Sequence, residues 1–291
     1  MSSPSRGIIY IVTGQSFVDE ACVSAASVKR CMPDIPITVF TDVAQSSSVF
    51  DEVVLIESPT HGPEDKILSI AKSPYRETLF LDSDTYMVDD SRELFSLLGR
   101  FDLAAAHAPY RAQYRAGDVP DCYPEFNTGV MLFRKSDQTG LLFERWGQIY
   151  REDRLRPPDW LFPGAASWYR HAIPNQPSFR RALYESALRV ATLPPEYNCR
   201  LVFPGFVHTR VKIIHGRAGS LSRTSAALNK TMLPRVHIMR WGRLKILESA
   251  MPPGEDFLAR TRWSLHHRGI AHTARTTVAR LVARVGKVFK R

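Results

Sequence analysis

The sequence lacks the features that mark membrane-spanning and secreted proteins. No window of its 291 residues holds the roughly 18 uninterrupted apolar residues that a membrane-spanning helix needs. The N-terminal stretch MSSPSRGIIYIVTG has only a short apolar run and no small-residue cleavage site. We therefore interpret it as a first strand and not as a signal peptide. We expect a soluble or peripheral protein.

Cysteine is also scarce. The four cysteines are scattered along the chain, and no two of them form a Cys-x-x-Cys pair. This spacing argues against a structural zinc site and against a disulfide framework. It fits a reducing environment, and we expect a cytoplasmic location.

Acidic residues are missing from the C-terminal end. Nine lysine or arginine residues and no acidic residue follow Asp256, and they carry most of the formal net charge of +10. Apolar residues recur there at helical spacing on one side: Ala274, Val278, Leu281, Val282, Val285 and Phe289. The pattern predicts a basic amphipathic tail over residues 256–291 that can lie on an anionic membrane, at its inner face. The alternative is a C-terminal helix docked on its own domain, with its basic side chains solvated.

The rest of the chain has ordinary globular composition. Hydrophobic residues make up 44% of the chain and charged residues 23%, and the part before the tail is nearly neutral. No nucleic-acid partner is expected, because a basic tail without a recognised binding fold is weak support for one.

Strand-like and helix-like segments alternate along the chain. Apolar strand-like runs lie at residues 7–14, 36–42, 52–57, 77–84, 102–109, 126–136 and 211–217. Helical patterns lie at residues 19–30, 91–101 with Ser91 as the N-cap, 137–152 and 176–186. Near-continuous apolar strands alternating with helices predict an α/β fold with a mostly parallel central sheet covered on both faces.

Polar residues stand at the ends of several of these strands. Thr13 and Gly14 end the first strand, Asp42 ends the second, and Asp82 and Asp84 end the fourth. In parallel sheets, ligands bind beyond the carboxyl ends of the strands. We therefore expect these residues to meet in one cleft.

The stretch LFLDSDT, residues 79–85, suits two kinds of chemistry. In a haloacid-dehalogenase-type phosphatase, Asp82 would attack phosphorus, Asp84 would protonate the leaving group and Thr85 would support the turn. That fold presents the motif on its first strand, whereas three strand-like segments precede it here. After residue 103 no later strand ends in the second acidic pair that would hold magnesium. The context argues against a phosphatase.

In a sugar-nucleotide transferase the same carboxylates would hold a divalent metal. The metal neutralises the nucleotide diphosphate as the sugar–phosphate bond breaks. Carboxylate oxygens suit Mg²⁺ or Mn²⁺, and an added imidazole shifts the preference towards Mn²⁺. His215 follows a short apolar strand and is the expected third ligand, and Arg217 is close enough in sequence to contact the diphosphate.

The segment SPYRETLFLDSDTYMVDDSRELF resembles the metal-binding segment of GT-A glycosyltransferases. It is similar in particular to glycosyltransferase family 8, the group of glycogenin and the bacterial lipopolysaccharide galactosyltransferases. The stretches VFTD, FNTGVMLFR, NQPSF and VKIIHG match in the order that the family shows them. Together the matches cover about residues 7–217.

The resemblance implies a GT-A, Rossmann-like fold, retention of configuration, and UDP-sugar donors used with Mn²⁺ or Mg²⁺. The residues that it implies are Asp82, Asp84 and His215 as metal ligands, Thr13, Gly14 and Asp42 near the nucleoside, Lys66, Ser83 and Arg217 near the diphosphate or donor sugar, and Asn127 and Gln176 in the sugar pocket. The expected organisation is a catalytic domain over residues 1–220, an extension packing on it over 221–255, and the tail. Each of three residues also has a purely structural interpretation. Lys66 can be a surface residue of its helix, and Asn127 and Gly129 can serve only to shape a turn.

The sequence departs from the family's pattern at two places. Asn175 stands where the family often has aspartate. A lysine usually follows the metal-binding histidine in the family, and Arg217 is only a candidate substitute for it here. Retention without a carboxylate nucleophile favours front-face substitution, in which Gln176 stabilises the developing positive charge. We expect a saccharide or lipid-linked glycan acceptor, bound by the insertions at residues 109–125 and 155–175. The alternative function is a catalytically silent nucleotide-binding or membrane scaffold of the same fold.

Overall fold

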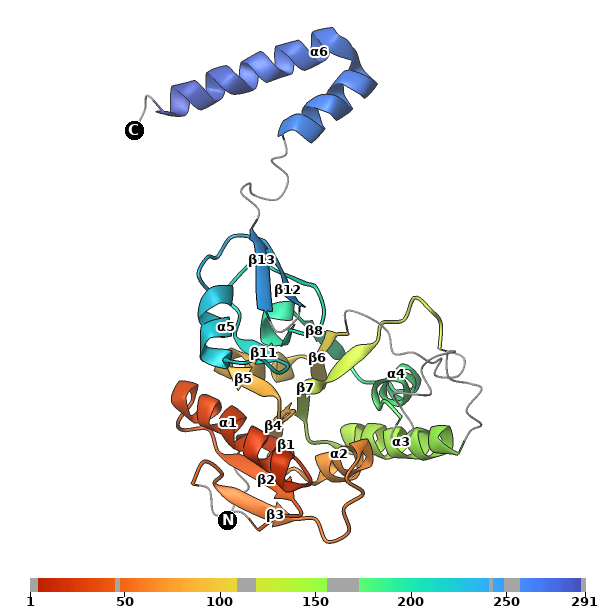
Figure 1. The fold of residues 1–291 in the computed structure, drawn as a ribbon. Helices are drawn as coiled ribbons and strands as arrows, with labels where there is room; N and C mark the ends of the chain where they lie inside the picture. The colour runs from red at the N-terminus through yellow and green to blue at the C-terminus, as the bar shows by residue number, and fades with distance from the viewer. Residues whose placement is uncertain are drawn as a thin grey trace.

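The computed structural model describes residues 5–44, 48–108, 119–155, 173–240, 243–248 and 257–288 (Figure 1). At its centre is a seven-stranded sheet with the order β3-β2-β1-β4-β7-β6-β8. The strands are β1 (Arg6–Ile11), β2 (Ile37–Thr41), β3 (Glu52–Leu55), β4 (Glu77–Leu81), β6 (Leu103–His107), β7 (Phe126–Arg134) and β8 (Val190–Leu193). Within this sheet only β7 runs antiparallel to its neighbours. The predicted α/β fold with a mostly parallel central sheet is confirmed.

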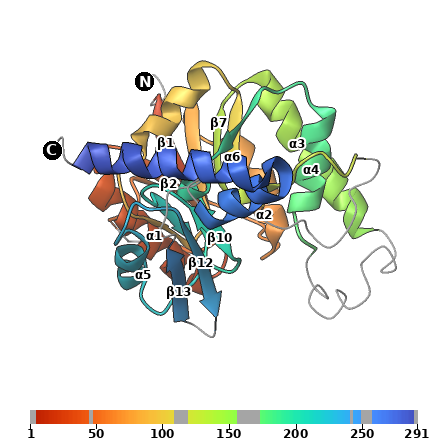
Figure 2. The ribbon, with the colours of Figure 1, turned by 90° about the horizontal axis from the view of Figure 1, so that it is seen from above.

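Helices cover both faces of this sheet (Figures 1 and 2). Helix α1 (Gln15–Cys31) and the 3₁₀ helix η2 (Arg92–Gly99) pack on one face, where they bury residues such as Val18, Val28 and Phe95. Helices α2 (Pro63–Ser69), α3 (Asp137–Arg154) and α4 (Gln176–Glu185) pack on the other, together with the 3₁₀ turn η1 (Ile70–Lys72).

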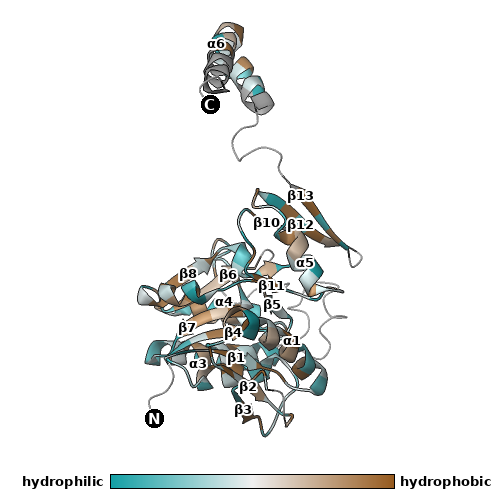
Figure 3. Cartoon of the chain, turned by 90° about the vertical axis from the view of Figure 1, so that its left-hand side faces the viewer, coloured by the Kyte–Doolittle hydropathy of each residue, from teal (hydrophilic) through white to brown (hydrophobic). Residues whose placement is uncertain are grey.

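The central strands are apolar along nearly their whole length because helices bury them from both sides. Residues 126–133 of β7 are all buried, and Figure 3 shows hydrophobic residues along this strand. On the α3 side, Trp146 is fully buried and packs edge-to-face on Phe179 of α4. Its indole Nε1 donates to the carbonyl of Asn175 at 3.0 Å, which fixes the start of α4.

Some expected boundaries are wrong. The predicted helix at residues 91–101 is a 3₁₀ helix, and Ser91 makes no capping hydrogen bond. The reason is that the Ser91 hydroxyl donates to the carbonyl of Asp89 and to Met87 Sδ instead. The helix expected at residues 19–30 begins earlier, directly after Gly14. Most of the two expected insertions, residues 109–118 and 156–172, lie outside the described residues.

Two small sheets extend the fold beyond the carboxyl edge of the main sheet. The first pairs β5 (Thr85–Met87), β11 (Ile213–His215) and β9 (Cys199–Arg200) in the order β5-β11-β9, near the 3₁₀ turn η4 (Pro195–Tyr197). The second pairs β10 (Gly205–Val207), β12 (Arg235–Arg240) and β13 (Arg243–Glu248), with α5 (Leu221–Leu228) beside them. A third apolar cluster, which includes Leu201, Val207 and Leu228, joins these elements. The first small sheet is what brings His215 to the end of β4.

The C-terminal helix α6 (Phe257–Val288) falls within the predicted tail. Its backbone leaves helical geometry at Gly269, where φ is 78° and ψ is 171°, a conformation that favours glycine. Among the described helices, none combines the length and the apolar character needed to cross a bilayer. Contact of the tail with a membrane surface stays a prediction.

Candidate metal and nucleotide site

Asp82 and Asp84 occupy a tight turn between β4 and β5. The Asp82 amide donates to the carbonyl of Gly129 on β7 at 2.8 Å, and the Asp82 carbonyl accepts from the Thr85 amide at 3.2 Å and from its hydroxyl at 2.8 Å. The Asp84 carbonyl accepts from the Gly216 amide at 2.9 Å. These backbone bonds fix both aspartates at the carboxyl edge of the sheet, next to the end of β11.

His215 completes a cluster of possible metal ligands with the two aspartates. One oxygen from each carboxylate and one imidazole nitrogen lie within 4.8 Å of one another. His215 Nε2 lies 3.2 Å from Asp84 Oδ1 and 3.9 Å from Asp82 Oδ2. The arrangement of two carboxylates and one imidazole is a candidate divalent-metal site, as the sequence predicts.

The orientation of the His215 ring suits metal binding. His215 is 5% exposed, and its Nδ1 lies 2.8 Å from Oδ1 of Asn198, an atom that can only accept. Nδ1 therefore donates to Asn198, and Nε2 faces the carboxylates. When protonated, Nε2 donates to Asp84 Oδ1, and a divalent ion would take the place of that proton. A hydrogen-bond partner on the second ring nitrogen is the usual way in which proteins orient a metal-binding histidine. The residues present fit a bound divalent ion.

Charge around the turn keeps the Asp84 carboxylate ionised. Burial acts to raise the pKa of Asp84, but the hydrogen bond to His215 and the charges of His215, Arg217 and Arg200 lower it to about 2. Because this folded-state pKa lies below the usual unfolded value of about 3.9, ionised Asp84 stabilises the fold above about pH 4. That contribution is lost as the pH falls towards 2.

Lys66 links the aspartates to the first half of the sheet. Its Nζ donates to Asp82 Oδ1 at 2.7 Å and to the carbonyl of Thr128 at 3.2 Å, so it is not a free surface residue. The neighbouring Asp65 accepts from the Thr13 hydroxyl at 2.7 Å. Helix α2 therefore connects the turn that carries Asp82 and Asp84, the DxD turn, with the end of β1.

Thr13, Gly14 and Asp42 meet where β1 and β2 end, as expected from the parallel sheet. The Gly14 amide donates to Asp42 Oδ1 at 2.8 Å, and Gly14 has a positive φ of 87° as it turns the chain into α1. Thr13 is held by Asp65, a residue that the sequence did not single out, whereas Gly14 is held by Asp42.

Ser83 and Arg217 share one partner that sequence reasoning missed. Glu20 of α1 accepts from the Ser83 hydroxyl at 2.6 Å and from two nitrogens of Arg217, at 2.6 and 2.9 Å. Ser83 is therefore tied to Arg217 through a carboxylate. The Arg217 side chain is 66% exposed.

A chain of side-chain amides connects the metal ligands with the predicted sugar-pocket residues. Asn198 Nδ2 donates to Asn127 Oδ1 at 2.8 Å, Asn127 Nδ2 donates to Gln176 Oε1 at 2.5 Å, and Gln176 Nε2 donates to Glu125 at 3.0 Å. The structure thus brings Asn127 and Gln176 into one network with His215. Asn198 and Glu125 were not predicted from the sequence. Asn198 is buried and directly precedes β9.

Replacing Asn198 with leucine should weaken Mn²⁺ binding by about 10- to 100-fold, because His215 would lose the acceptor that orients it. Asn198→Asp keeps an acceptor for Nδ1 but loses the donor to Asn127, so its Mn²⁺ affinity should fall by less than that of Asn198→Leu. Electron paramagnetic resonance of free Mn²⁺ during a titration measures the Mn²⁺ affinity of both variants. Equal affinities for Asn198→Leu and the wild type would mean that this contact does not orient a ligand.

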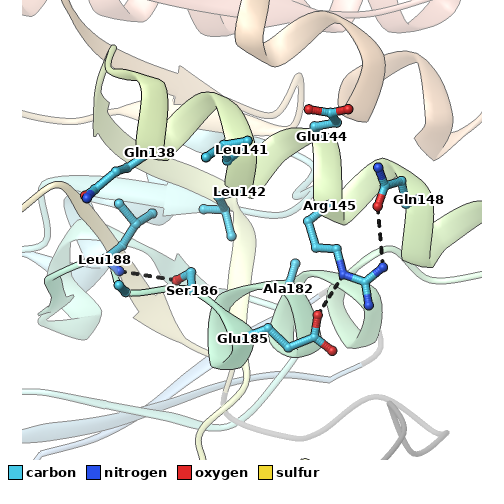
Figure 4. Close-up of a pocket in the computed structure, with 11 residues that line it drawn as sticks. Gln138, Leu141, Leu142, Glu144, Arg145, Gln148, Ala182, Glu185, Ser186 and Leu188 are labelled. Atoms are coloured by element: carbon cyan, nitrogen blue, oxygen red, sulfur yellow. Dashed lines mark hydrogen bonds and ion pairs between the residues drawn. The ribbon is translucent and has the colours of Figure 1, made fainter.

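Two pockets flank these elements. One, of about 570 Å³, lies between α3, α4 and the segment that follows α4 (Figure 4). It contains no predicted site residue, and its Arg145 is paired with Glu185. The other, of about 600 Å³, lies beyond the ends of β6 and β8 and is lined in part by Asn198, Arg200 and Phe206. Since Asn198 also holds His215, the second pocket borders the candidate metal site.

Fold and site together define an α/β protein with a mostly parallel seven-stranded sheet and a candidate metal centre of two aspartates and a histidine. No protein-family model matches the chain, and no curated protein matches it in sequence. Among solved structures, it is similar to the galactosyltransferase LgtC in complex with donor and acceptor sugar analogues, with 15% identity and a TM-score of 0.47, over 77% of this chain and 93% of that one.

Two further solved structures are similar at the same level. Mouse xyloside xylosyltransferase 1 has 16% identity and a TM-score of 0.46, over 73% of this chain and 98% of that one. The glycosyltransferase GlyE of Streptococcus pneumoniae TIGR4 has 18% identity and a TM-score of 0.46, over 68% of this chain and 47% of that one. All three TM-scores lie below 0.5, so the resemblance to family 8 glycosyltransferases stays a prediction.

Proposed function

We propose that this protein is a metal-dependent glycosyltransferase that takes a sugar from a nucleotide diphosphate donor, with a UDP-sugar as the expected donor. The observation that carries the proposal is the Asp82, Asp84 and His215 cluster, placed at the carboxyl edge of the sheet with the Nδ1 of His215 committed to Asn198. Ligands of open α/β sheets bind at this edge.

The three ligands would hold Mn²⁺ or Mg²⁺, which supplies neutralisation of the diphosphate as it leaves. Lys66 already binds the Asp82 oxygen Oδ1, so Oδ2 stays directed towards His215. Thr13, Gly14 and Asp42 would contact the nucleoside where β1 and β2 end, and Ser83 and Arg217 would lie near the diphosphate. The metal site and the nucleoside site would be adjacent because Asp65 and Lys66 follow each other on α2.

Gln176 and Asn127 are the proposed sugar-pocket residues. The amide of Gln176 is held at both ends, its oxygen by Asn127 and its nitrogen by Glu125. A side chain fixed in this way can direct an amide oxygen at developing positive charge without reorganising. We propose front-face substitution with retention, towards a saccharide or lipid-linked glycan acceptor. Mass spectrometry that traps a glycosyl adduct on an acidic side chain would contradict the front-face route.

The phosphatase alternative loses support from the charges around Asp84. A general acid has to be protonated near the working pH, whereas the pKa of Asp84 is lowered to about 2. Asp84 is therefore a poor proton donor and a good metal ligand.

Titration calorimetry with a panel of UDP-sugars, with and without Mn²⁺, tests the proposal. We expect binding that requires the metal and that is strongest for one donor sugar. Slow hydrolysis of that donor would then separate an enzyme from a silent binding domain. If the folded protein binds no nucleotide sugar, the proposal is wrong.

A further inference from the structure

Arg200 is a further cation near the candidate metal site. Neither the Asp82 and Asp84 motif nor the segment around His215 indicates it from the sequence. It lies on the two-residue strand β9, directly paired with His215 on the parallel strand β11. Side chains of paired residues on neighbouring strands point to the same face. Arg200 is therefore directed towards the side of the small sheet that carries the metal ligand, and it also lines the pocket of about 600 Å³.

The guanidinium of Arg200 has unmet hydrogen-bonding capacity. Its Nε is buried and has no hydrogen-bond partner within the described part of the chain. Its carbon Cζ lies 5.3 Å from the centre of the Phe203 ring, which holds the planar group in place. Buried donors in folded proteins nearly always have partners, so an orphan at a candidate site requires an explanation.

Asp82 and Asp84 are near enough for their charges to act on Arg200. Burial lowers the pKa of Arg200, and the two carboxylates act in the opposite direction. Once a divalent cation neutralises these carboxylates, Arg200 would be left as a half-buried positive charge without a counter-ion. An anion that arrives with the metal would supply that counter-ion.

The other cations around the turn already have partners. Lys66 is bound to Asp82 and to the carbonyl of Thr128. Arg217 makes two hydrogen bonds to Glu20 and is mostly exposed. Of these three cations, Arg200 is the one with a buried donor still to satisfy.

We propose that Arg200 binds the diphosphate of the nucleotide donor, beside the metal and next to the 600 Å³ pocket that Arg200 lines. This inference rests on the proposed function. The planar guanidinium matches two phosphate oxygens at once, which a lysine ammonium cannot do. Arg200 thereby supplies the positive charge that Arg217, bound to Glu20, provides only in part.

Calorimetry with UDP and with UMP, both in the presence of Mn²⁺, tests the assignment. Arg200→Gln should weaken UDP binding by about 10- to 100-fold, the effect of losing a charged hydrogen bond. It should change UMP binding by less than about 3-fold, because UMP lacks the second phosphate. Arg200→Lys keeps the charge but loses the planar guanidinium that can bind two phosphate oxygens. Its UDP affinity should therefore lie between that of Arg200→Gln and the wild type.

The matched control is Arg210→Gln, which removes an arginine paired with Asp89 at the surface and should leave both affinities unchanged. If Arg200→Gln does not fold, Arg200→Lys carries the test alone. Unchanged UDP affinity in the folded variants, or equal losses for UDP and UMP, would overturn the role of Arg200 and leave the proposed function intact. Absence of Mn²⁺-dependent UDP binding in the wild type would overturn both.

Discussion

Replacing Asp84 with asparagine should lower the Mn²⁺-dependent affinity for UDP by about 100-fold or more. Asparagine keeps the shape of the side chain but removes a full negative charge next to the metal, where the medium screens charge weakly. Because the pKa of Asp84 is lowered to about 2, the wild-type carboxylate is fully ionised at neutral pH and this charge is lost completely. Calorimetry with UDP at pH 7, with Mn²⁺ and then with excess chelator, measures the effect.

The control for this substitution is Asp89→Asn on the same segment. Asp89 pairs with Arg210 and Lys212 and is not part of the ligand cluster. Asp89→Asn should change UDP affinity by less than about 2-fold, which is the size of effect that an exposed surface charge typically has. If Asp84→Asn binds UDP and Mn²⁺ as well as Asp89→Asn does, the cluster is not a metal site and the proposed function loses its main support.

The framework of this site could be predicted from the sequence because it follows from strand polarity. Thr13, Asp42 and Asp82 each follow an apolar run, and parallel strands present their carboxyl ends at one edge. The helices expected from composition were also present, because amphipathic segments had a sheet face to cover. His215 could be placed as a ligand because it too ends a short apolar strand, now seen to pair with β5 directly after the DxD turn.

The partners of these residues could not be predicted, because they depend on contacts between distant segments. Glu20 lies on the helix α1 and meets Arg217 almost two hundred residues later. Asn198 and Arg200 flank the start of a two-residue strand, which is too short for any periodic pattern. The N-cap expected at Ser91 failed for a related reason, since its hydroxyl found acceptors at Asp89 and Met87.

Replacing Gly129 with alanine should lower the Mn²⁺-dependent affinity for UDP by about 100-fold, at the upper end of the range for residues that support metal ligands. Gly129 lies within the regular strand β7, and a positive φ is not the reason for glycine here. The reason is space. A Cβ at Gly129 would lie 2.6 Å from Asp82 Oδ2 and 2.9 Å from His215 Nε2, the two atoms directed at the metal position, and would also collide with His215 Cε1.

Neither ligand can easily move away from this methyl group. His215 is 5% exposed and is held by Asn198, and Asp82 is held by Lys66 and by its own amide bond to Gly129. Overpacking of this kind typically costs about 1–3 kcal/mol of stability, so the variant should fold but with displaced ligands. Circular dichroism and urea unfolding establish the fold, and a Mn²⁺ titration followed by UDP calorimetry measures the site.

Gly140→Ala on α3 is the matched control, because nothing lies within 4 Å of the added methyl group. It should leave UDP binding unchanged and stabilise the helix by about 0.5–1 kcal/mol. A Gly129→Ala variant that binds Mn²⁺ and UDP like the wild type would place the metal elsewhere. Loss of binding in Gly129→Ala alone would show that β7 keeps a glycine at this point to leave room for the two ligands.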